Sequence, residues 1–321
     1  MLACAILDDY QGIATTIADW RGLSGKVDVQ VFRDHIFDRA ALAEALQRFE
    51  IVVAMRERTA FDAPLFERLP NLKLLVTTGL RNASIDLVAA EKRGVTVCGT
   101  QSAVGSTSEL AWGLIFSLMR DIPAEVARFR AGGRWQAGVG RGVHGKTLGV
   151  VGVGNLGARA AKAGVAFGMD VSGWSRSLTE ERCRELGIRR AASLDELLAG
   201  SDVITLHLTL NAQSRGLIGE REFGLMRPGA ILVNTSRGPI VDERALIDAL
   251  RGRRIAGAGI DVYDVEPLPD DHPFRSLDNL VATPHLGYVT EESYRVYYGQ
   301  AVEDIAAWMG GNPVRVLKPA G

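Results

Sequence analysis

Short apolar runs alternate with amphipathic stretches along almost the whole of this chain, and that rhythm restricts the fold more than any other feature. In the first hundred residues we predict strands at 2–7, 27–32, 51–54, 72–76 and 95–98, with helices at 40–48, 63–68 and 86–93. Strand, helix and strand in this order are typical of a parallel sheet with helices on both faces. The sequence therefore predicts an α/β fold.

A second series of the same kind follows a long helical pattern over 106–130 and a turn-rich segment at 132–138. Its predicted strands are 147–152, 170–174, 202–206, 230–234, 256–260 and 280–282, with helices between them, including one at 242–250. The last helical pattern, 291–309, is long enough to return to the first series. Two such series predict two doubly wound parallel-sheet domains, with the chain passing from one to the other near residue 102.

Length and charge exclude several classes of protein. The 321 residues suit two domains of roughly 150 residues each. The 37 Lys and Arg residues nearly balance the 38 Asp and Glu residues without a long run of one sign, so no nucleic acid or membrane surface is indicated as a partner. Apolar stretches such as 110–119 are shorter than the roughly 20 residues of a membrane span.

The three cysteines lack metal-ligand spacing, and the N-terminus lacks the basic start of a signal peptide. We therefore expect reduced thiols, no bound metal and a cytoplasmic location.

A Gly-x-Gly-x-x-Gly motif directly follows the predicted strand 147–152 and precedes a helical pattern. Gly152 permits a tight turn, Gly154 lets the backbone approach a pyrophosphate, and Gly157 lets the helix pack close to the strand. The amides around Asn155 and Leu156 would then bind the phosphates at the helix N-terminus. With 36 glycines in the chain, an ordinary glycine-rich turn is the alternative, but the flanking strand and helix favour a dinucleotide site.

The end of the next predicted strand bears on the choice of dinucleotide. NAD-selective sites usually place an acidic residue there to bind the ribose 2′-hydroxyl, whereas this chain has Ser175 and Arg176. A hydroxyl and a guanidinium suit a 2′-phosphate, so the sequence favours NADP over NAD. In the alternative, Arg176 is a solvated loop residue and NAD binds without the acidic anchor.

Three polar residues follow successive predicted strands of the second series. Arg237 follows strand 230–234, Glu266 follows strand 256–260, and His285 follows strand 280–282. The carboxyl ends of parallel strands form the edge where open α/β sheets bind ligands. Each residue alone could be structural, but three in this order after consecutive strands indicate a catalytic site.

These segments closely resemble the D-isomer-specific 2-hydroxyacid dehydrogenase family. The resemblance covers nearly the whole chain and includes the segments 108–111, 206–208, 225–230 and 241–246. It implies a flavodoxin-like substrate domain of residues 1–101 plus 290–321, with a Rossmann-type NAD(P)-binding domain of residues 102–289 inserted into it. The active site would lie in the cleft.

The resemblance also implies roles for the three catalytic candidates. Arg237 would bind the substrate carboxylate and polarise the carbonyl. His285 would be the general acid in reduction and the general base in oxidation, because free histidine titrates near about 6.5. Glu266 would bond the far ring nitrogen, fixing the tautomer and favouring the imidazolium. The nicotinamide carries the hydride.

Further contacts are implied by the same resemblance. The cofactor candidates are Gly152, Gly154, Asn155, Leu156, Gly157, Ser175, Arg176, His207, Thr209, Thr235, Asp261 and Thr107, and the substrate candidates are Arg56, Gly79, Leu80, Arg81 and Tyr288. The loop at 77–83 departs from the family pattern, and Thr209 stands where the family often has proline. Arg81 either adds a cation for a second acidic group or faces solvent.

The sequence thus predicts an oxidoreductase that moves a hydride between NAD(P)H and a small 2-oxo or 2-hydroxy acid whose identity it does not specify, and the resemblance implies that the enzyme is D-stereospecific. The family commonly pairs through the region 106–141, which here carries Trp135 among glycines, so we expect a homodimer. The alternative is a nucleotide-sensing binding protein like the corepressors that share this fold, although this chain has no extra disordered tails.

Overall fold

The structure is a computed structural model that describes residues 1–319. The chain forms two compact units. The first consists of Met1–Val104 together with the segment from Val289 onward, and the second consists of Gly105–Tyr288. We refer to them as the first unit and the second unit.

The first unit contains a five-stranded sheet in which every pair of neighbours is parallel. Its strands are β1 (Leu2–Ile6), β2 (Val27–Val31), β3 (Ile51–Ala54), β4 (Leu74–Thr77) and β5 (Thr96–Gly99). Their order in space is β2-β1-β3-β4-β5, which is the flavodoxin-like order.

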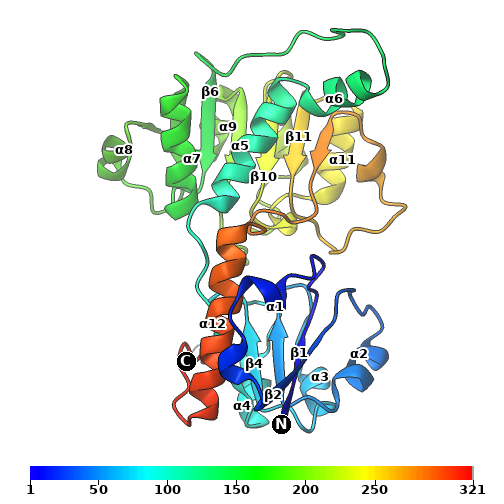
Figure 1. The fold of residues 1–321 in the computed structure, drawn as a ribbon. Helices are drawn as coiled ribbons and strands as arrows, with labels where there is room; N and C mark the ends of the chain where they lie inside the picture. Colours follow the sequence, from blue (N-terminus) through cyan, green and yellow to red (C-terminus); the bar gives the residue numbers. More distant parts are fainter. Residues whose placement is uncertain (320–321) are drawn as a thin grey trace. The chain divides into compact units, whose positions relative to one another are not determined.

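Helices cover both faces of this sheet (Figure 1). They are α1 (Ala14–Ile17), α2 (Arg39–Leu46), α3 (Ala63–Glu67), α4 (Leu87–Lys92) and α12 (Glu291–Met309), with a short 3-10 helix, η1 (Arg21–Leu23). Apolar side chains of α2, α3 and α4 form one core with the strands, while α12 packs against α1 and β4. Aspartate side chains cap the N-termini of α2, α3 and α4, which explains where these helices begin.

The second unit contains a seven-stranded sheet, again entirely parallel. Its strands are β6 (Thr147–Val151), β7 (Asp170–Trp174), β8 (Arg189–Arg190), β9 (Val203–Leu206), β10 (Ile231–Asn234), β11 (Gly257–Ile260) and β12 (Leu280–Ala282). The spatial order β12-β11-β10-β9-β6-β7-β8 is a Rossmann order extended by one strand. The chain order reverses between β6 and β9, and open α/β sheets bind ligands at such a point.

Two helical layers enclose this sheet (Figure 1). The helices are α5 (Ser106–Met119), α6 (Ile122–Arg130), α7 (Asn155–Ala166), α8 (Glu180–Leu186), α9 (Leu194–Gly200), α10 (Glu220–Leu225) and α11 (Glu243–Arg251), with 3-10 helices η2 (Gly238–Ile240) and η3 (Pro273–Ser276). Apolar residues of α5, α7 and α8 pack on one face, and those of α9, α10 and α11 pack on the other.

The predicted α/β class with two parallel sheets is confirmed, but one predicted helix was wrong and short elements such as α1 and β8 were missed. The single helix expected over 106–130 is divided into α5 and α6, because Asp121 between them adopts a left-handed φ of 52°. The strand β8 was missed, since it has two residues, both charged and exposed. Among residues 1–319, no helix is long and apolar enough to cross a membrane.

Candidate active site

The glycine motif forms the turn between β6 and α7. A Cβ atom on Gly152, which has a φ of 92°, would lie 2.3 Å from the carbonyl oxygen of His207, and one on Gly157 would lie 1.9 Å from that of Gly152. A Cβ on Gly154 would meet nothing within 4 Å. Gly152 and Gly157 are therefore required by packing within the protein, whereas Gly154 faces space that a ligand can occupy.

The N-terminus of α7 has no side-chain cap. Its N-cap residue is Gly154, whereas Thr179, Ser193 and Asp242 cap α8, α9 and α11 with side-chain oxygens. The first amides of a helix have no intrahelical acceptor, so those near Asn155 are oriented to donate to an anion.

Two buried polar atoms at the same edge of the sheet lack a partner. His207 directly follows β9, and Thr235 directly follows β10. The Nδ1 atom of His207 and the hydroxyl of Thr235 are shielded from solvent and have no hydrogen-bond partner among the residues that the structure describes. Because buried polar atoms are usually paired, both fit a polar ligand at this sheet edge.

His207 is a poor candidate for the proton donor. Its Nε2 lies 3.0 Å from the Thr205 hydroxyl. Burial lowers the pKa of His207 to about 4, so the ring is neutral near pH 7.

Ser175 and Arg176 occupy the two positions after β7. The Arg176 guanidinium is exposed and bonds Gln213 through both its side-chain and backbone oxygens, the latter at 3.3 Å. Gln213 belongs to the same loop as Thr209, which is also exposed and whose carbonyl accepts from Ser214 at 2.7 Å. A guanidinium thus lies at the strand end where dinucleotide-binding folds bind the ribose.

The histidine candidate contacts the glutamate candidate directly. His285 Nδ1 lies 2.5 Å from Glu266 Oε2, and the other carboxylate oxygen, Oε1, accepts the Tyr263 N–H at 2.9 Å. The side chains of His285 and Glu266 are 18% and 32% exposed, so both remain accessible. His285 has a φ of 53°, which is uncommon for a residue other than glycine and is found at functional sites.

Asp261 is fully buried beneath the turn that carries His285. Its carboxylate accepts the Thr283 hydroxyl at 2.6 Å and the amides of Leu286 and Gly287 at 2.7 and 2.8 Å. Burial is the main cause that raises the pKa of this carboxyl group, while the three donors act in the opposite direction. The Thr107 hydroxyl donates to the Gly287 carbonyl at 3.0 Å. Two predicted cofactor contacts, Asp261 and Thr107, thus fix the histidine turn.

Arg237 lies in the turn after β10, and the turns that carry Glu266 and His285 follow β11 and β12. These strands are direct neighbours, so the three turns share one edge of the sheet. The Arg237 side chain donates to the Ser236 carbonyl at 2.7 Å, and its own carbonyl accepts from Asn234 Nδ2 at 2.9 Å. Tyr288 is buried with its ring 5.2 Å from the His285 ring.

The remaining substrate candidates lie in the first unit. Gly79 has a φ of 109°, and a Cβ there would lie 2.2 Å from Arg56 Nη1, so the guanidinium covers this glycine. The Gly79 amide donates to the Thr100 hydroxyl at 3.0 Å. Leu80 and Arg81 are exposed, and no hydrogen bond or ion pair of the Arg81 side chain is found in the described part of the chain.

Sequence reasoning missed two residues that hold this site. Tyr263 bonds Glu266 through its N–H, and its hydroxyl donates to the Thr283 carbonyl at 2.8 Å. The only available signal was their position, since Tyr263 lies between Asp261 and Glu266 and Thr283 lies two residues before His285.

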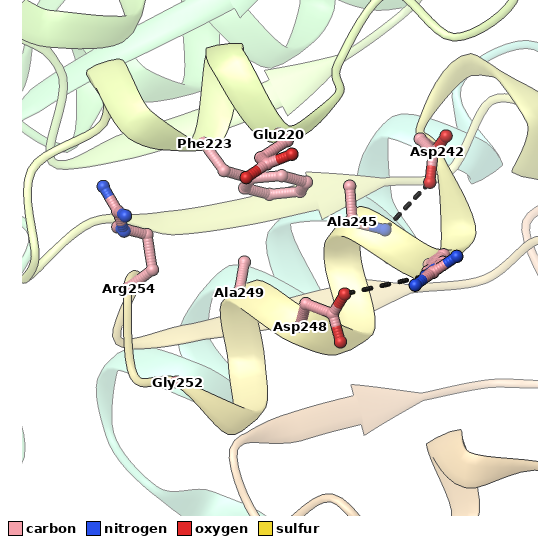
Figure 2. A pocket seen from close by; sticks show the side chains of 9 residues that line it. Glu220, Phe223, Asp242, Ala245, Asp248, Ala249, Gly252 and Arg254 are labelled. Carbon is pink, nitrogen blue, oxygen red and sulfur yellow. Dashed lines mark hydrogen bonds and ion pairs between the residues drawn. The ribbon is translucent and has the colours of Figure 1, made fainter.

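A hollow of about 630 Å³ lies elsewhere on the second unit, along α10 and α11 (Figure 2). None of its lining residues is a site candidate. Asp242 caps α11 by accepting from Ala245, and Arg244 pairs with Asp248 at 4.0 Å. Within residues 1–319 there is no cluster of three or more His, Cys, Asp or Glu residues that could bind a metal.

The fold and this edge define a dinucleotide-binding α/β protein, and comparison with known proteins identifies the family. Residues 112–287 match the D-isomer specific 2-hydroxyacid dehydrogenase, NAD binding domain. The chain belongs to this family, and the match supports a nicotinamide cofactor.

Similar proteins carry names of reductases and dehydrogenases. A glyoxylate reductase of Thermococcus litoralis is 37% identical over 79% of both chains. A D-3-phosphoglycerate dehydrogenase of Archaeoglobus fulgidus is 36% identical over 86% of this chain and 53% of that protein. The crystal structure of a phosphoglycerate oxidoreductase from Vibrio cholerae has a TM-score of 0.92 and 37% identity, covering 97% of this chain and 100% of that one. The chain spans about half the length of the phosphoglycerate dehydrogenases it matches.

Proposed function

We propose that this protein is a nicotinamide-dependent oxidoreductase that interconverts a small 2-oxo acid and its D-2-hydroxy acid. The observation that carries the proposal is the contact of 2.5 Å between His285 and Glu266, on a sheet edge that also bears Arg237. A histidine oriented by a carboxylate is a suitable proton donor and acceptor near neutral pH. A guanidinium binds a carboxylate with well-defined geometry.

In the proposed reduction, Arg237 binds the substrate carboxylate and polarises the neighbouring carbonyl. His285 donates the proton on Nε2 to the carbonyl oxygen as that oxygen becomes an alcohol. Glu266 keeps Nδ1 protonated and stabilises the positive ring before transfer. The bound nicotinamide supplies the hydride in this direction and accepts it in the other. In oxidation His285 takes the hydroxyl proton back.

Several features support a dinucleotide on the second unit. The uncapped N-terminus of α7 would bind the pyrophosphate through the amides of Asn155 and Leu156. Gly154 offers open space, and the unpartnered atoms of His207 and Thr235 lie at neighbouring strand ends. Asp261 and Thr107 would contribute as well, although both already bond the histidine turn.

We further propose that NADPH is preferred over NADH. The support is local: Ser175 and Arg176 stand after β7 in place of an acidic residue. The Arg176 guanidinium is exposed and held by Gln213, and a guanidinium binds phosphate through paired donors.

The residues proposed to contact substrate are considered in each unit separately. In the first unit they are Arg56, Gly79, Leu80 and Arg81, and in the second unit Tyr288. For Gly79 the amide is already bonded to Thr100, so the amides of the exposed residues Leu80 and Arg81 are the better donors to a carboxylate.

A homodimer is also proposed, with α6 and the segment after it as the interface. No residue of α6 is buried, while Trp135 is 80% and Val139 is 100% exposed, and a monomer has little reason to display such side chains. A monomeric mass by light scattering at micromolar concentration would contradict this. A cytoplasmic location is supported by three buried, unbridged cysteines.

The activity is tested by measuring oxidation of NADH and NADPH with a panel of acids. The panel contains glyoxylate, hydroxypyruvate, pyruvate, phenylpyruvate and 2-oxoglutarate, with Arg237→Ala as the comparison variant. We expect turnover with at least one acid and a higher KM and lower kcat in the variant, because the carboxylate is bound in both ground and transition states. No turnover with any pair would reject the proposal.

A further inference from the structure

We propose that Tyr263 is a positioning residue that ties together the three turns carrying Arg237, Glu266 and His285. The inference rests on the proposed function, since it assigns a role to a residue beside the proposed catalytic groups. Tyr263 lies in the turn after β11, between Asp261 and Glu266. Three separate contacts of Tyr263 support this role, and each involves one of the turns.

The first contact orients the Glu266 carboxylate. The Tyr263 N–H donates to Glu266 Oε1 at 2.9 Å, and the second oxygen, Oε2, lies 2.5 Å from His285 Nδ1. A carboxylate with one oxygen fixed by a backbone donor has less freedom to rotate away from the imidazole. The backbone of Tyr263 therefore sets the orientation in which Glu266 meets the ring.

The second contact fixes the backbone of the histidine turn. The Tyr263 hydroxyl donates to the Thr283 carbonyl at 2.8 Å, and the same carbonyl accepts the His285 N–H at 3.0 Å. His285 has a φ of 53°, a conformation that is disfavoured unless the surroundings impose it. Asp261 supports the turn through the Thr283 hydroxyl and the amides of Leu286 and Gly287. The phenol thus adds the restraint on the Thr283 carbonyl.

The third contact involves the arginine turn. A Cβ on Gly238, the residue after Arg237, would lie 2.1 Å from the carbonyl carbon of Tyr263. The backbones of these two turns therefore pack directly on one another. Because Tyr263 is 9% exposed and its ring centroid lies 6.3 Å from that of Phe274, the residue also packs within the core. A close-packed residue that contacts all three turns restricts how far each turn can move relative to the others.

Burial raises the pKa of Tyr263, so its hydroxyl stays protonated and can donate at neutral pH. Phenylalanine would keep the ring packing and the backbone contacts and would remove only the bond to Thr283. A loss of activity in this variant would therefore come from the missing hydrogen bond and not from altered packing. Tyr263→Phe is therefore the informative variant.

The matched control is Tyr297→Phe. Tyr297 is fully buried in α12, and its hydroxyl bonds the Ser102 hydroxyl at 3.1 Å, so this variant also removes a buried, hydrogen-bonded phenol oxygen. Tyr297 and Ser102 both belong to the first unit, so the bond that is removed does not involve any of the three turns. Any general cost of losing such a bond affects both variants alike.

We expect Tyr263→Phe to lower kcat by about 2- to 10-fold with KM for the cofactor unchanged, the effect of weakening one hydrogen bond in the transition state. Tyr297→Phe should leave kcat within about twofold of wild type. Equal kcat in wild type and Tyr263→Phe would overturn the inference. So would a rise in KM with unchanged kcat.

A second measurement does not depend on turnover. Long-range proton–nitrogen NMR correlations distinguish an imidazole protonated on Nδ1 from one protonated on Nε2, and His285→Ala assigns the His285 signals. We expect neutral His285 to be protonated on Nδ1 in wild type and in Tyr297→Phe, with a mixture of tautomers in Tyr263→Phe. If no acid in the panel is reduced, the proposed function fails, yet the tautomer result still decides whether Tyr263 orients His285. An unchanged tautomer in Tyr263→Phe would refute the positioning role.

Discussion

Each unit of this protein contains a histidine whose Nδ1 faces a carboxylate at the edge of a parallel sheet. In the first unit His35 Nδ1 lies 2.9 Å from Asp8 Oδ1, and in the second unit His285 Nδ1 lies 2.5 Å from Glu266 Oε2. One member of each pair has a left-handed backbone, with a φ of 56° for Asp8 and 53° for His285. By distance and backbone alone the two pairs are nearly equivalent.

Their surroundings differ. Asp8 is 2% exposed, its second carboxylate oxygen accepts the Thr59 hydroxyl at 2.7 Å, and its carbonyl accepts from Arg58 at 2.6 Å. Glu266 is accessible, and the neighbouring strand presents Arg237 at the same edge. The side chains of His35 and His285 are 14% and 18% exposed, so the pairs differ in the carboxylate, which is buried in Asp8 and accessible in Glu266 on the sheet edge that also bears Arg237. A histidine–carboxylate contact therefore indicates catalysis only together with an accessible substrate-binding group.

The largest expected effect separates the two histidines. His285→Ala should lower kcat for reduction by about 10²–10⁴-fold, because a general acid acts as the oxygen gains charge, and cofactor affinity should be nearly unchanged. His35→Ala should leave kcat within about threefold and reduce thermal stability instead. Steady-state kinetics and thermal unfolding of both variants give the answer. A similar loss of kcat in both would remove the distinction between the pairs.

The second prediction asks whether the dinucleotide binds on the unit that carries His285. Gly154→Ala should weaken cofactor binding by about 10- to 100-fold without changing the thermal midpoint, because the added methyl group meets open space in the protein and would clash with a bound pyrophosphate. Gly157→Ala is the control and should also destabilise the fold, since its Cβ would lie 1.9 Å from the Gly152 oxygen. Calorimetric titration with NADPH measures the affinity. Unchanged affinity in Gly154→Ala would place the cofactor elsewhere.

The third prediction exchanges the two carboxylates for amides. Glu266→Gln should lower kcat by about tenfold, because the charge-assisted hydrogen bond to His285 is replaced by a neutral one. Asp8→Asn should keep wild-type kcat and lose about 1–3 kcal/mol of unfolding free energy, because a buried acceptor of two bonds is altered. Steady-state kinetics and denaturant unfolding distinguish these patterns. A similar loss of kcat in Asp8→Asn would show that the two carboxylates do not have different roles.

The smallest predicted effect concerns cofactor choice. Arg176→Ala should weaken NADPH by about fivefold and NADH by less than twofold, since an exposed guanidinium contributes roughly 1 kcal/mol to a phosphate. Dissociation constants for both dinucleotides provide the measurement. Equal losses of affinity for NADPH and NADH would show that Arg176 does not bind the 2′-phosphate.

The sequence predicted the sheets because parallel strands buried on both faces appear as apolar runs, and β3, β7 and β12 have the predicted bounds. The break at Asp121 was missed, although Pro123 in the first turn of α6 is a signal of a helix boundary. The contact of Glu266 with His285 agrees with what the family resemblance implied, and strand order alone predicted only that both lie at one sheet edge.

The supporting bonds could not be predicted, because they depend on how turns far apart in the chain meet. The Tyr263 hydroxyl reaches a carbonyl 20 residues away, and Asp261 binds amides 25 and 26 residues away. The pair of His35 and Asp8 was not predicted either, since no motif links them. Conversely, a search for histidine–carboxylate contacts alone would also find His272, which lies 3.0 Å from Glu243. The order of the sequence motifs is therefore needed to distinguish His285.

Transfer of a labelled hydride from the cofactor to the substrate is the most direct test of the proposed activity. NADPH carrying deuterium at the transferable position of C4 is incubated with the best acid of the panel, and NMR locates the label in the product. We predict deuterium at C2 of a D-2-hydroxy acid with wild type and His35→Ala, and none above background with His285→Ala over the same time. Absence of label with wild type, or full labelling with His285→Ala, would contradict the account and favour a nucleotide-sensing binding protein.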